Sequence, residues 1–348
     1  MLRRDFYFDL PPELVAQYPS ETRGGDRLLH LRGDGSVAHC VMRDLPSLIP
    51  PDALMVFNNS RVRRARVFAV NEATGREAEF LFVAPLSPAS WKVVAKRGKK
   101  QKTGMRYRFG GGVSGAVADN AAFGGTEFRE LLLSPAIDER WFEAHGHVPL
   151  PPYIKRGDTA LDGERYQNVY AAETGSVACP TAGLHFTGEL LARIAEAGIE
   201  TAEVTLHVGP GTFLPVRSER IEDHEMHEES YTVGTAAAAR VNAAKRAGRP
   251  VVAVGTTSAR TLESAWSAEA GLRAGSGSTR IFIYPGYRFR AADLLFTNFH
   301  TPESTLLMLA CAFAGKERIM RAYGEAIAHK YRFFSYGDAM LIDAPSPA

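Results

Sequence analysis

From about residue 151 to the end of the chain, segments that alternate like β-strands are separated by segments with the periodicity of amphipathic helices. One predicted helix, 187–198 (TGELLARIAEAG), has Thr187 as its N-cap and Gly198 just beyond its end. The fully apolar segment 250–255 (PVVAVG) and the segment 279–286 (TRIFIYPG) are predicted strands. Strands and helices in this order predict an α/β fold, in which helices cover a sheet.

The stretch from about 61 to 134 has a different pattern, because short strand-like segments follow one another with Gly- and Ser-containing turns between them. This spacing favours a small antiparallel β-barrel. The first 60 residues also contain strands, which would join the main sheet. We therefore expect a main α/β domain with a mixed sheet, formed by 1–60 and 151–348, and an inserted β-barrel domain formed by 61–150.

The segment 110–115 (GGGVSG) matches the G-x-G-x-x-G spacing of dinucleotide-binding loops. It lies between two predicted strands, and no helix follows it. That motif needs a strand before it and a helix after it, so we reject a dinucleotide site here.

Composition excludes several classes of protein. The chain has 348 residues, 45% of them hydrophobic, yet no apolar run approaches the roughly 20 residues of a membrane span. Charged residues and prolines interrupt the N-terminal segment, so we expect no signal peptide. Cys40, Cys179 and Cys311 are far apart in the sequence, which argues against a disulfide framework or a thiolate zinc site. We expect a cytoplasmic globular protein without membrane contact.

Charge is distributed unevenly along the chain. Residues 61–108 contain 13 Lys or Arg against 3 Glu, a net charge of +10, whereas the whole chain has only +2 and the remainder therefore about −8. Seven of these basic residues lie in 96–108 (KRGKKQKTGMRYR). Either this segment is a solvated hairpin or it binds phosphate groups, because clustered Lys and Arg release counterions from nucleic acid. The residues that would bind are Lys96, Arg97, Lys99, Lys100 and Lys102.

Four predicted strand ends carry the same kind of residues: 179–187, 207–213, 255–264 and 297–305 each mix Gly or Pro with Thr, Ser or His. Ligands of open α/β sheets bind beyond the carboxyl ends of the strands, near helix N-termini. We therefore expect the four segments to line one pocket in one sheet. The candidate binding residues are Thr181, Gly183, His207, Gly209, Gly211, Thr212, Thr256, Thr257, Ser258, Arg260 and Asn298.

Several single residues have two interpretations. Cys179 is either a nucleophile or a small buried thiol, and we favour the thiol. His185 and His300 belong either to the pocket or to the core. His224 and His227 have an H-x-x-H spacing but no third ligand in the sequence pattern, so we predict no metal site there. Arg260 lies near a predicted helix N-terminus that attracts anions, so a carboxylate ligand fits there.

The segments GSVACPTAGLHFT (175–187), VVAVGTTSARTLES (251–264) and TNFHTPESTLLMLACAFAG (297–315), among others, resemble a known family. That family is the S-adenosylmethionine:tRNA ribosyltransferase-isomerases of queuosine biosynthesis. The resemblance is densest from 147 to 342 and extends to the flanking 5–19. In most members of that family, as we know them, alanine stands at the position of Cys179, which argues against a nucleophilic role for this thiol. The segments that carry the resemblance include GSVACPTAGLHFT (175–187), TLHVGPGTFLPV (205–216), HEMHEESY (224–231), VVAVGTTSARTLES (251–264), TNFHTPESTLLMLACAFAG (297–315), PLPPYIKR (149–156) and YRFFSYGDAMLI (331–342).

The resemblance implies a reaction. The ribosyl part of S-adenosylmethionine is transferred to 7-aminomethyl-7-deazaguanine at the wobble position of tRNA and isomerised, which yields epoxyqueuosine and releases adenine and methionine. S-adenosylmethionine is then a consumed co-substrate, and neither a cofactor nor a metal is needed. The tRNA anticodon arm is the expected macromolecular partner, and we expect a monomer.

Within this reaction, our inference from side-chain chemistry assigns His185 or His300 as the general base. Arg260 and the backbone amides of 256–258 would hold the methionine carboxylate, and the basic segment 96–108 would grip the anticodon arm. Two other classes of protein stay open from the residues alone. One is a non-catalytic RNA-binding protein, and the other is a metal hydrolase that uses His224 and His227.

Overall fold

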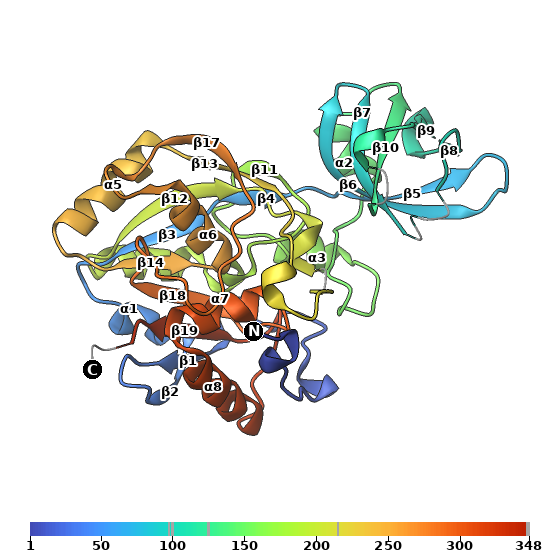
Figure 1. The fold of residues 1–348 in the computed structure, drawn as a ribbon. Helices are drawn as coiled ribbons and strands as arrows, with labels where there is room; N and C mark the ends of the chain where they lie inside the picture. The colour runs from blue at the N-terminus through green and yellow to red at the C-terminus, as the bar shows by residue number, and fades with distance from the viewer. Residues whose placement is uncertain (97, 99–100, 124–125, 214–215, 346–348) are drawn as a thin grey trace.

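The computed structural model describes residues 1–96, 98, 101–123, 126–213 and 216–345. A large α/β body is joined to a smaller barrel that stands at one end of it (Figure 1). This arrangement confirms the predicted fold class, whereas the limits of the inserted domain at 60 and 150 stay a prediction.

The body is built on a nine-stranded mixed sheet. β12, β3, β14 and β18 form its parallel centre, and antiparallel pairs join β13 to β12 and β18 to β19. In spatial order the strands are β17 (Gly275–Thr279), β13 (Glu229–Val233), β12 (Glu200–Leu206), β3 (Leu54–Asn58), β14 (Val251–Val254), β18 (Leu294–Asn298), β19 (Ala339–Asp343), β1 (Arg27–Leu31) and β2 (Val37–Val41).

Helices cover both faces of this sheet. The body's helices are α1 (Leu45–Leu48), α3 (Ala160–Arg165), α4 (Gly188–Glu196), α5 (Thr235–Arg246), α6 (Thr256–Ala265), α7 (Thr305–Ala314) and α8 (Lys316–Ala328). In β14, Val251 and Ala253 pack in a core with α5 to α8, whereas Val252 and Val254 pack in a second core with α1 and α4. A strand that is buried on both faces must be apolar throughout, which explains the apolar run 251–254.

The smaller part is a closed six-stranded barrel. Its strands, in chain order, are β5 (Arg66–Asn71), β6 (Glu77–Ser87), β7 (Ser90–Ala95), β8 (Arg106–Arg108), β9 (Ser114–Val117) and β10 (Phe128–Ser134), and α2 (Glu139–His145) packs against it. Aromatic residues fill its interior, among them Phe80, Phe82 and Trp91. The segment 110–115 forms a short turn and the start of β9 with no helix after it, as expected for a loop that binds no dinucleotide.

Two short ladders complete the structure: β4 (Ser60–Val62) pairs with β11 (Glu173–Ser176), and β15 (Trp266–Ser267) pairs with β16 (Gly271–Leu272). Thr187 caps α4 as predicted, because its hydroxyl accepts a hydrogen bond from the Leu190 amide at 3.0 Å.

The prediction of a strand at 279–286 is wrong. β17 is the edge strand of the sheet and ends at Thr279. The hydrophobic residues that follow it pack as irregular chain against the core.

A buried ionic network fastens α3 to the C-terminal part of the body. Asp162 is fully buried and accepts hydrogen bonds from both terminal nitrogens of Arg156, at 2.6 and 2.8 Å, and from the Tyr336 hydroxyl at 2.7 Å. Burial opposes ionisation of Asp162, yet the hydrogen bonds from Arg156, Tyr336 and Thr159 hold its pKa well below its usual range.

We expect Asp162→Asn to lower the free energy of unfolding by about 3 to 5 kcal/mol at pH 7, because the variant leaves a partly buried Arg156 without its counter-charge. A group with a lowered folded-state pKa stabilises above its unfolded pKa of about 3.9. The difference from the parent protein should therefore shrink as the pH falls below about 4. Denaturant unfolding at several pH values measures it. The exposed Asp119 receives the same substitution as a control, and an equal effect of both variants would contradict the prediction.

Candidate functional site

Four polar segments meet at one edge of the main sheet. β12, β14 and β18 run in the same direction, so the residues that follow them, from His207, Gly255 and Phe299 onward, emerge together. The fourth segment, 179–187, follows β11, which pairs with β4 outside the main sheet. The expectation that all four strands share one sheet is therefore wrong, although a Val177 amide to Val208 carbonyl hydrogen bond of 3.0 Å brings this segment to the same edge.

Two adjoining cavities lie where these segments meet, with volumes of about 50 and 30 Å³. Ligand pockets usually measure about 300 to 1,000 Å³, so a ligand of nucleoside size needs the surrounding loops to move apart. Five residues line both cavities: Cys179, Thr181, Asn298, His300 and Leu306. The first cavity also contains Tyr153, Phe299, Thr301, Phe334 and Ser335, and the second also contains Pro180, Ala182, Val208, Gly255, Thr256, Thr257 and Thr297.

His300 lines both cavities. Its Nε2 lies 2.9 Å from the Thr297 hydroxyl, and its backbone amide donates to the Tyr323 hydroxyl at 2.9 Å. Burial lowers the pKa of His300 to about 3, because the charged ring loses its hydration. At neutral pH the ring is therefore uncharged, and in these surroundings it is a weak base.

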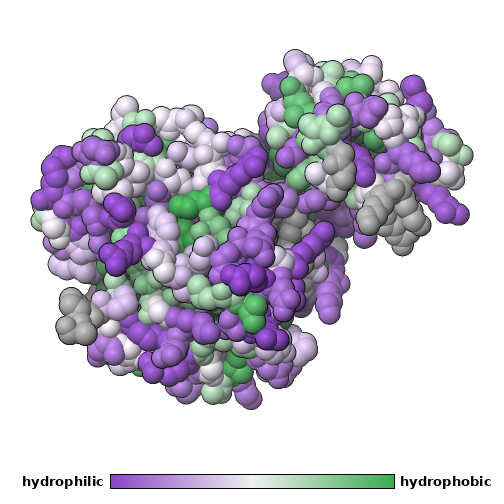
Figure 2. All heavy atoms as spheres, viewed as in Figure 1, coloured by the Kyte–Doolittle hydropathy of each residue, from purple (hydrophilic) through white to green (hydrophobic). Residues whose placement is uncertain are grey.

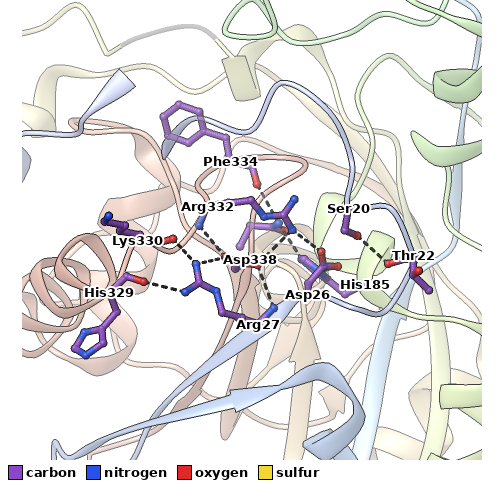
Figure 3. A network of polar contacts seen from close by, with 11 residues as sticks. Ser20, Thr22, Asp26, Arg27, His185, His329, Lys330, Arg332, Phe334 and Asp338 are labelled. Atoms are coloured by element: carbon purple, nitrogen blue, oxygen red, sulfur yellow. Dashed lines mark hydrogen bonds and ion pairs between the residues drawn. The ribbon is translucent and has the colours of Figure 1, made fainter. Parts of the chain in front are cut away.

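His185, the other predicted base, does not line these two cavities. Its Nδ1 lies 2.7 Å from the Asp26 carboxylate (Figure 3). Its Nε2 lies 3.0 Å from the Asn298 amide nitrogen. Because Asp26 accepts from Nδ1–H, the ring accepts from Asn298 at Nε2, and both nitrogens are used. Of the two predicted bases, the geometry favours His300 as the residue that meets a ligand, with His185 as a buried link between segments.

Asn298 contacts His185, and it lines the two cavities together with His300. Its amide nitrogen also donates to the Phe334 carbonyl at 3.1 Å, whereas its Oδ1 is buried and has no partner among the described residues. Phe334 lies in the left-handed region with φ 74°, which is strained for an aromatic residue. An unpaired buried acceptor beside a strained backbone at a cavity wall is what a ligand-binding position requires.

α6 begins at the second cavity. Gly255 has φ 92°, a conformation that favours glycine, and it turns the chain from β14 into the helix. The first-turn amides of Thr256, Thr257 and Ser258 have no intrahelical partner, and the helix dipole adds positive potential there. Thr257 is positioned by Asn58, whose side-chain amide donates to the Thr257 hydroxyl at 3.1 Å. This helix end is suited to a carboxylate.

Arg260 does not line the two cavities and pairs instead with Glu229. One terminal nitrogen of this buried side chain forms an ion pair with Glu229, whose other oxygen accepts from the Gly209 amide at 2.9 Å. The second terminal nitrogen is buried without a partner within the described part of the chain. Arg260 lines neither cavity, so its predicted role toward a carboxylate stays a prediction that requires this free nitrogen or a rearrangement of the Glu229 pair.

The remaining predicted binding residues lie in different places, and they do not share one environment. A Cβ on Gly183 would collide with the Tyr170 hydroxyl and the Asn168 amide, and a Cβ on Gly211 would lie 2.7 Å from the His227 ring, so both glycines allow close packing. His207 lines a separate surface groove, and burial with the nearby Arg63 lowers its pKa. The side chain of Thr212 lies outside what the structure describes.

Cys179 behaves as a packing residue. It is buried, and burial raises the pKa of its thiol far above the ordinary value, so almost no thiolate exists at neutral pH. The sulfur contacts the Asn168 side-chain oxygen at 3.7 Å. A nucleophilic cysteine needs a lowered pKa, so the favoured interpretation of a buried thiol fits these surroundings.

The basic segment is only partly described, because Arg97, Lys99 and Lys100 lie outside the described residues. Lys96 lies 3.3 Å from Glu79, and Lys102 is exposed. In the space-filling view most of the visible face is hydrophilic, and a notch separates the barrel from the body (Figure 2). Of the predicted RNA-binding residues, Lys96 and Lys102 are described, and both lie in the chain between β7 and β8 of the barrel.

His224 and His227 do not form a metal site with a third ligand among the described residues. His227 instead lies 3.4 Å from Glu127 at the barrel, and the His224 ring packs against Phe282. The metal-hydrolase alternative has no support from this geometry. No helix in the described part of the chain is long and apolar enough to cross a membrane.

Some candidate functional residues could not be identified from the sequence, because their hydrogen-bonding partners lie far away along the chain. Asp26, Glu229 and Asn58 bind residues 159, 31 and 199 positions away, and neither spacing nor periodicity links such pairs. The only available signal for Glu229 was a carboxylate within an otherwise strand-like segment.

Two small adjoining cavities at the carboxyl edge of an α/β sheet, beside a helix N-terminus, are typical of small-molecule-binding α/β proteins. The sequence model of a family described as queuosine biosynthesis protein matches residues 3–342. The chain belongs to this family.

Curated relatives share nearly the whole chain. The S-adenosylmethionine:tRNA ribosyltransferase-isomerase of Treponema denticola is 52% identical over 347 residues, 98% of this chain and 100% of that protein. The protein of the same name from Symbiobacterium thermophilum is 49% identical over 340 residues, 97% of this chain and 98% of its own. The crystal structure of S-adenosylmethionine tRNA ribosyltransferase from Thermotoga maritima is 33% identical, covers 97% of this chain and 99% of that chain, and has a TM-score of 0.54. The resemblance predicted from the sequence is confirmed.

We expect Gly183→Ala to destabilise the protein by about 1 to 3 kcal/mol without any ligand, because the added methyl group overpacks the contact with Tyr170 and Asn168. Thermal unfolding of the purified protein measures the effect. Gly188→Ala is the matched control, since no atom lies within 4 Å of a Cβ built there. An unchanged unfolding temperature for Gly183→Ala would show that the glycine is not needed for packing.

Proposed function

We propose that this protein is an S-adenosylmethionine:tRNA ribosyltransferase-isomerase. It transfers the ribosyl part of S-adenosylmethionine to 7-aminomethyl-7-deazaguanine at the tRNA wobble position and isomerises it to the epoxycyclopentanediol of epoxyqueuosine, with release of adenine and methionine. The observation that carries the proposal is family membership over residues 3–342, together with the convergence of the family-like segments on one cavity. S-adenosylmethionine is the consumed co-substrate, no separate cofactor takes part, and the enzyme works in the cytoplasm as a monomer.

The reaction needs a base beside the sulfonium, because that cation acidifies the neighbouring carbon. His300 is the proposed base, since its neutral ring lies in both cavities and is held by Thr297. Burial lowers the conjugate-acid pKa of this ring to about 3. Nearby negative charge would raise the basicity of the ring, and the methionine carboxylate supplies such a charge when it binds.

The first-turn amides of α6 are proposed to hold the methionine carboxylate. Thr256 and Thr257 line the second cavity, and the helix N-terminus faces it with unpaired donors. Arg260 is proposed to assist through its unpartnered terminal nitrogen, and the unpaired Asn298 oxygen to accept a hydrogen bond from a donor group of the substrate. Thr181, which lines both cavities, is a proposed wall of the same site.

The tRNA anticodon arm is proposed to bind across the barrel, with Lys96, Arg97, Lys99, Lys100 and Lys102 on its phosphates. The wobble base must leave its stack to reach the chemistry, as single-stranded loop bases do in protein complexes. The notch between barrel and body is the proposed route of this base (Figure 2).

One experiment separates this enzyme from a non-catalytic RNA-binding protein. Purified protein is incubated with S-adenosylmethionine and tRNA that contains 7-aminomethyl-7-deazaguanine, and adenine is quantified by chromatography. We expect adenine only when both substrates are present, in amounts equal to the modified tRNA formed. Binding of tRNA without adenine release would instead favour the non-catalytic protein.

We expect His300→Ala to lower kcat by about 100- to 10,000-fold, the usual contribution of a general base. Cys179→Ala, a second change in the same two cavities, should retain most activity, because the thiol only packs there. Steady-state kinetics of both variants with saturating substrates provides the comparison. A large loss in Cys179→Ala with the fold intact would instead indicate covalent catalysis.

Replacing Lys99, Lys100 and Lys102 with Ala should raise KM for tRNA and leave KM for S-adenosylmethionine nearly unchanged. Turnover at saturating tRNA should persist, since binding energy that is equal in ground and transition states changes KM rather than kcat. The slope of log affinity against log salt should flatten by roughly 0.7 for each phosphate of single-stranded RNA that the variant no longer neutralises. If neither KM for tRNA nor the salt slope changes, the RNA binds elsewhere.

A further inference from the structure

Two histidines and a glutamate meet at an outer corner of the body, away from the cavities described above. His39 belongs to β2, the edge strand of the main sheet, whereas Glu325 lies in the last turn of α8 and His329 directly follows that helix. One donor atom from each of the three residues lies within 4.8 Å of the other two. All three side chains are partly exposed, at 38%, 44% and 52% of their surface, so an ion in solution can reach them.

The distances within this group match a metal centre. Ligand atoms about 2.0 to 2.1 Å from a tetrahedral zinc ion are roughly 3.3 Å apart. The Glu325 carboxylate oxygen lies 3.4 Å from His39 Nε2 and 3.3 Å from His329 Nδ1. The His39 and His329 rings are neighbours with centroids 4.3 Å apart, and their ligand atoms lie within 4.8 Å of each other, so the two nitrogens must come closer to share one ion.

Neighbouring groups already orient the ligands. The Tyr331 hydroxyl lies 2.9 Å from His39 Nδ1, which directs the other ring nitrogen toward Glu325. Tyr331 is itself buried, with the Arg27 guanidinium 4.1 Å from its ring centre. Partners of this kind, which hold the remote nitrogen of a ligating histidine, are a regular feature of protein metal sites.

His329 can change partner at little cost. Its Nδ1 now lies 3.0 Å from the Glu325 backbone carbonyl, a bond that metal ligation at this nitrogen would break. The same carbonyl also accepts a 3.0 Å hydrogen bond from the His329 backbone amide. The carbonyl therefore stays satisfied when the ring turns to a metal ion.

We propose that His39, Glu325 and His329 form a binding site for a late first-row transition metal ion such as Zn²⁺, with water as the fourth ligand. Two imidazoles and one carboxylate favour Zn²⁺, Cu²⁺ or Ni²⁺ over Mg²⁺ and Ca²⁺, which prefer sites made of oxygen ligands alone. The ion binds the edge strand to the end of α8 and braces Tyr331. The next residue, Arg332, pairs with Asp26 at 2.7 Å, so the metal site stabilises the segment that also holds His185.

The test uses full-length protein without an affinity tag, treated with EDTA and dialysed. Calorimetric titration with ZnCl₂ should show one tight site per chain, and the unfolding temperature should rise with zinc concentration, because an ion that binds only the folded state stabilises it. MgCl₂ at the same concentrations should have no such effect.

His39→Ala and His329→Ala should each abolish the zinc-dependent rise in unfolding temperature, and Tyr331→Phe should weaken zinc binding about 10- to 100-fold while keeping the ring in the core. The double variant His224→Ala, His227→Ala is the matched control and should bind zinc like the parent protein. Absence of zinc binding by the parent protein overturns the proposal. A zinc effect that survives the loss of both His39 and His329 overturns it as well.

Discussion

The buried carboxylate of Asp26 links three parts of the chain that are far apart in sequence. One oxygen bonds His185, 159 residues later, and the other bonds Arg332 near the C-terminus, each at 2.7 Å (Figure 3). Arg332 also reaches Asp338, which in turn pairs with Arg27. Burial alone would raise the pKa of Asp26, but the His185 ring and Arg332 lower it below its ordinary value, so the carboxylate stays charged. The cavities depend on this linkage, because Asn298 and Phe334 are positioned through the same segments.

The parallel centre of the main sheet explains why the polar loops gather at one edge. Strands that run in the same direction end on the same side, and the helices that follow them begin there. At this edge lie an uncharged histidine, an amide oxygen without a partner among the described residues and the first-turn amides of α6, around two cavities of about 50 and 30 Å³. Such a site excludes water when closed, which strengthens every charge interaction made inside it.

The barrel is held to the segments around it by a few specific contacts. Arg63 forms an ion pair with Glu139, and its guanidinium carbon lies 5.0 Å from the centre of the Trp91 ring. On another side, His227 of the body lies 3.4 Å from Glu127 of the barrel. Between such contacts the two lobes are separated by the notch seen at the surface (Figure 2).

Much of the architecture could be predicted because its causes are local. Thr187 caps α4, the run 251–254 must be apolar to lie between two helical layers, and the short alternating segments from 66 to 134 close a barrel. Each of these signals acts within a few residues, so a single sequence contains it. The same kind of local pattern gave a wrong prediction of a strand at 279–286. There the hydrophobic residues pack on the core without a neighbouring strand to pair with.

From the sequence, the candidate site could be predicted only as a group of loops that follow the strands, and not as a set of facing side chains. The sequence alone determined that Gly-, Thr- and His-rich segments follow the strands, since these residue types suit turns and helix starts. Only the tertiary structure decided which side chains face the cavities: His300 does, His185 is bound at both nitrogens, and Arg260 is paired with Glu229. Contacts between residues far apart in the chain leave no periodic pattern, because they depend on how whole elements pack rather than on neighbours in sequence.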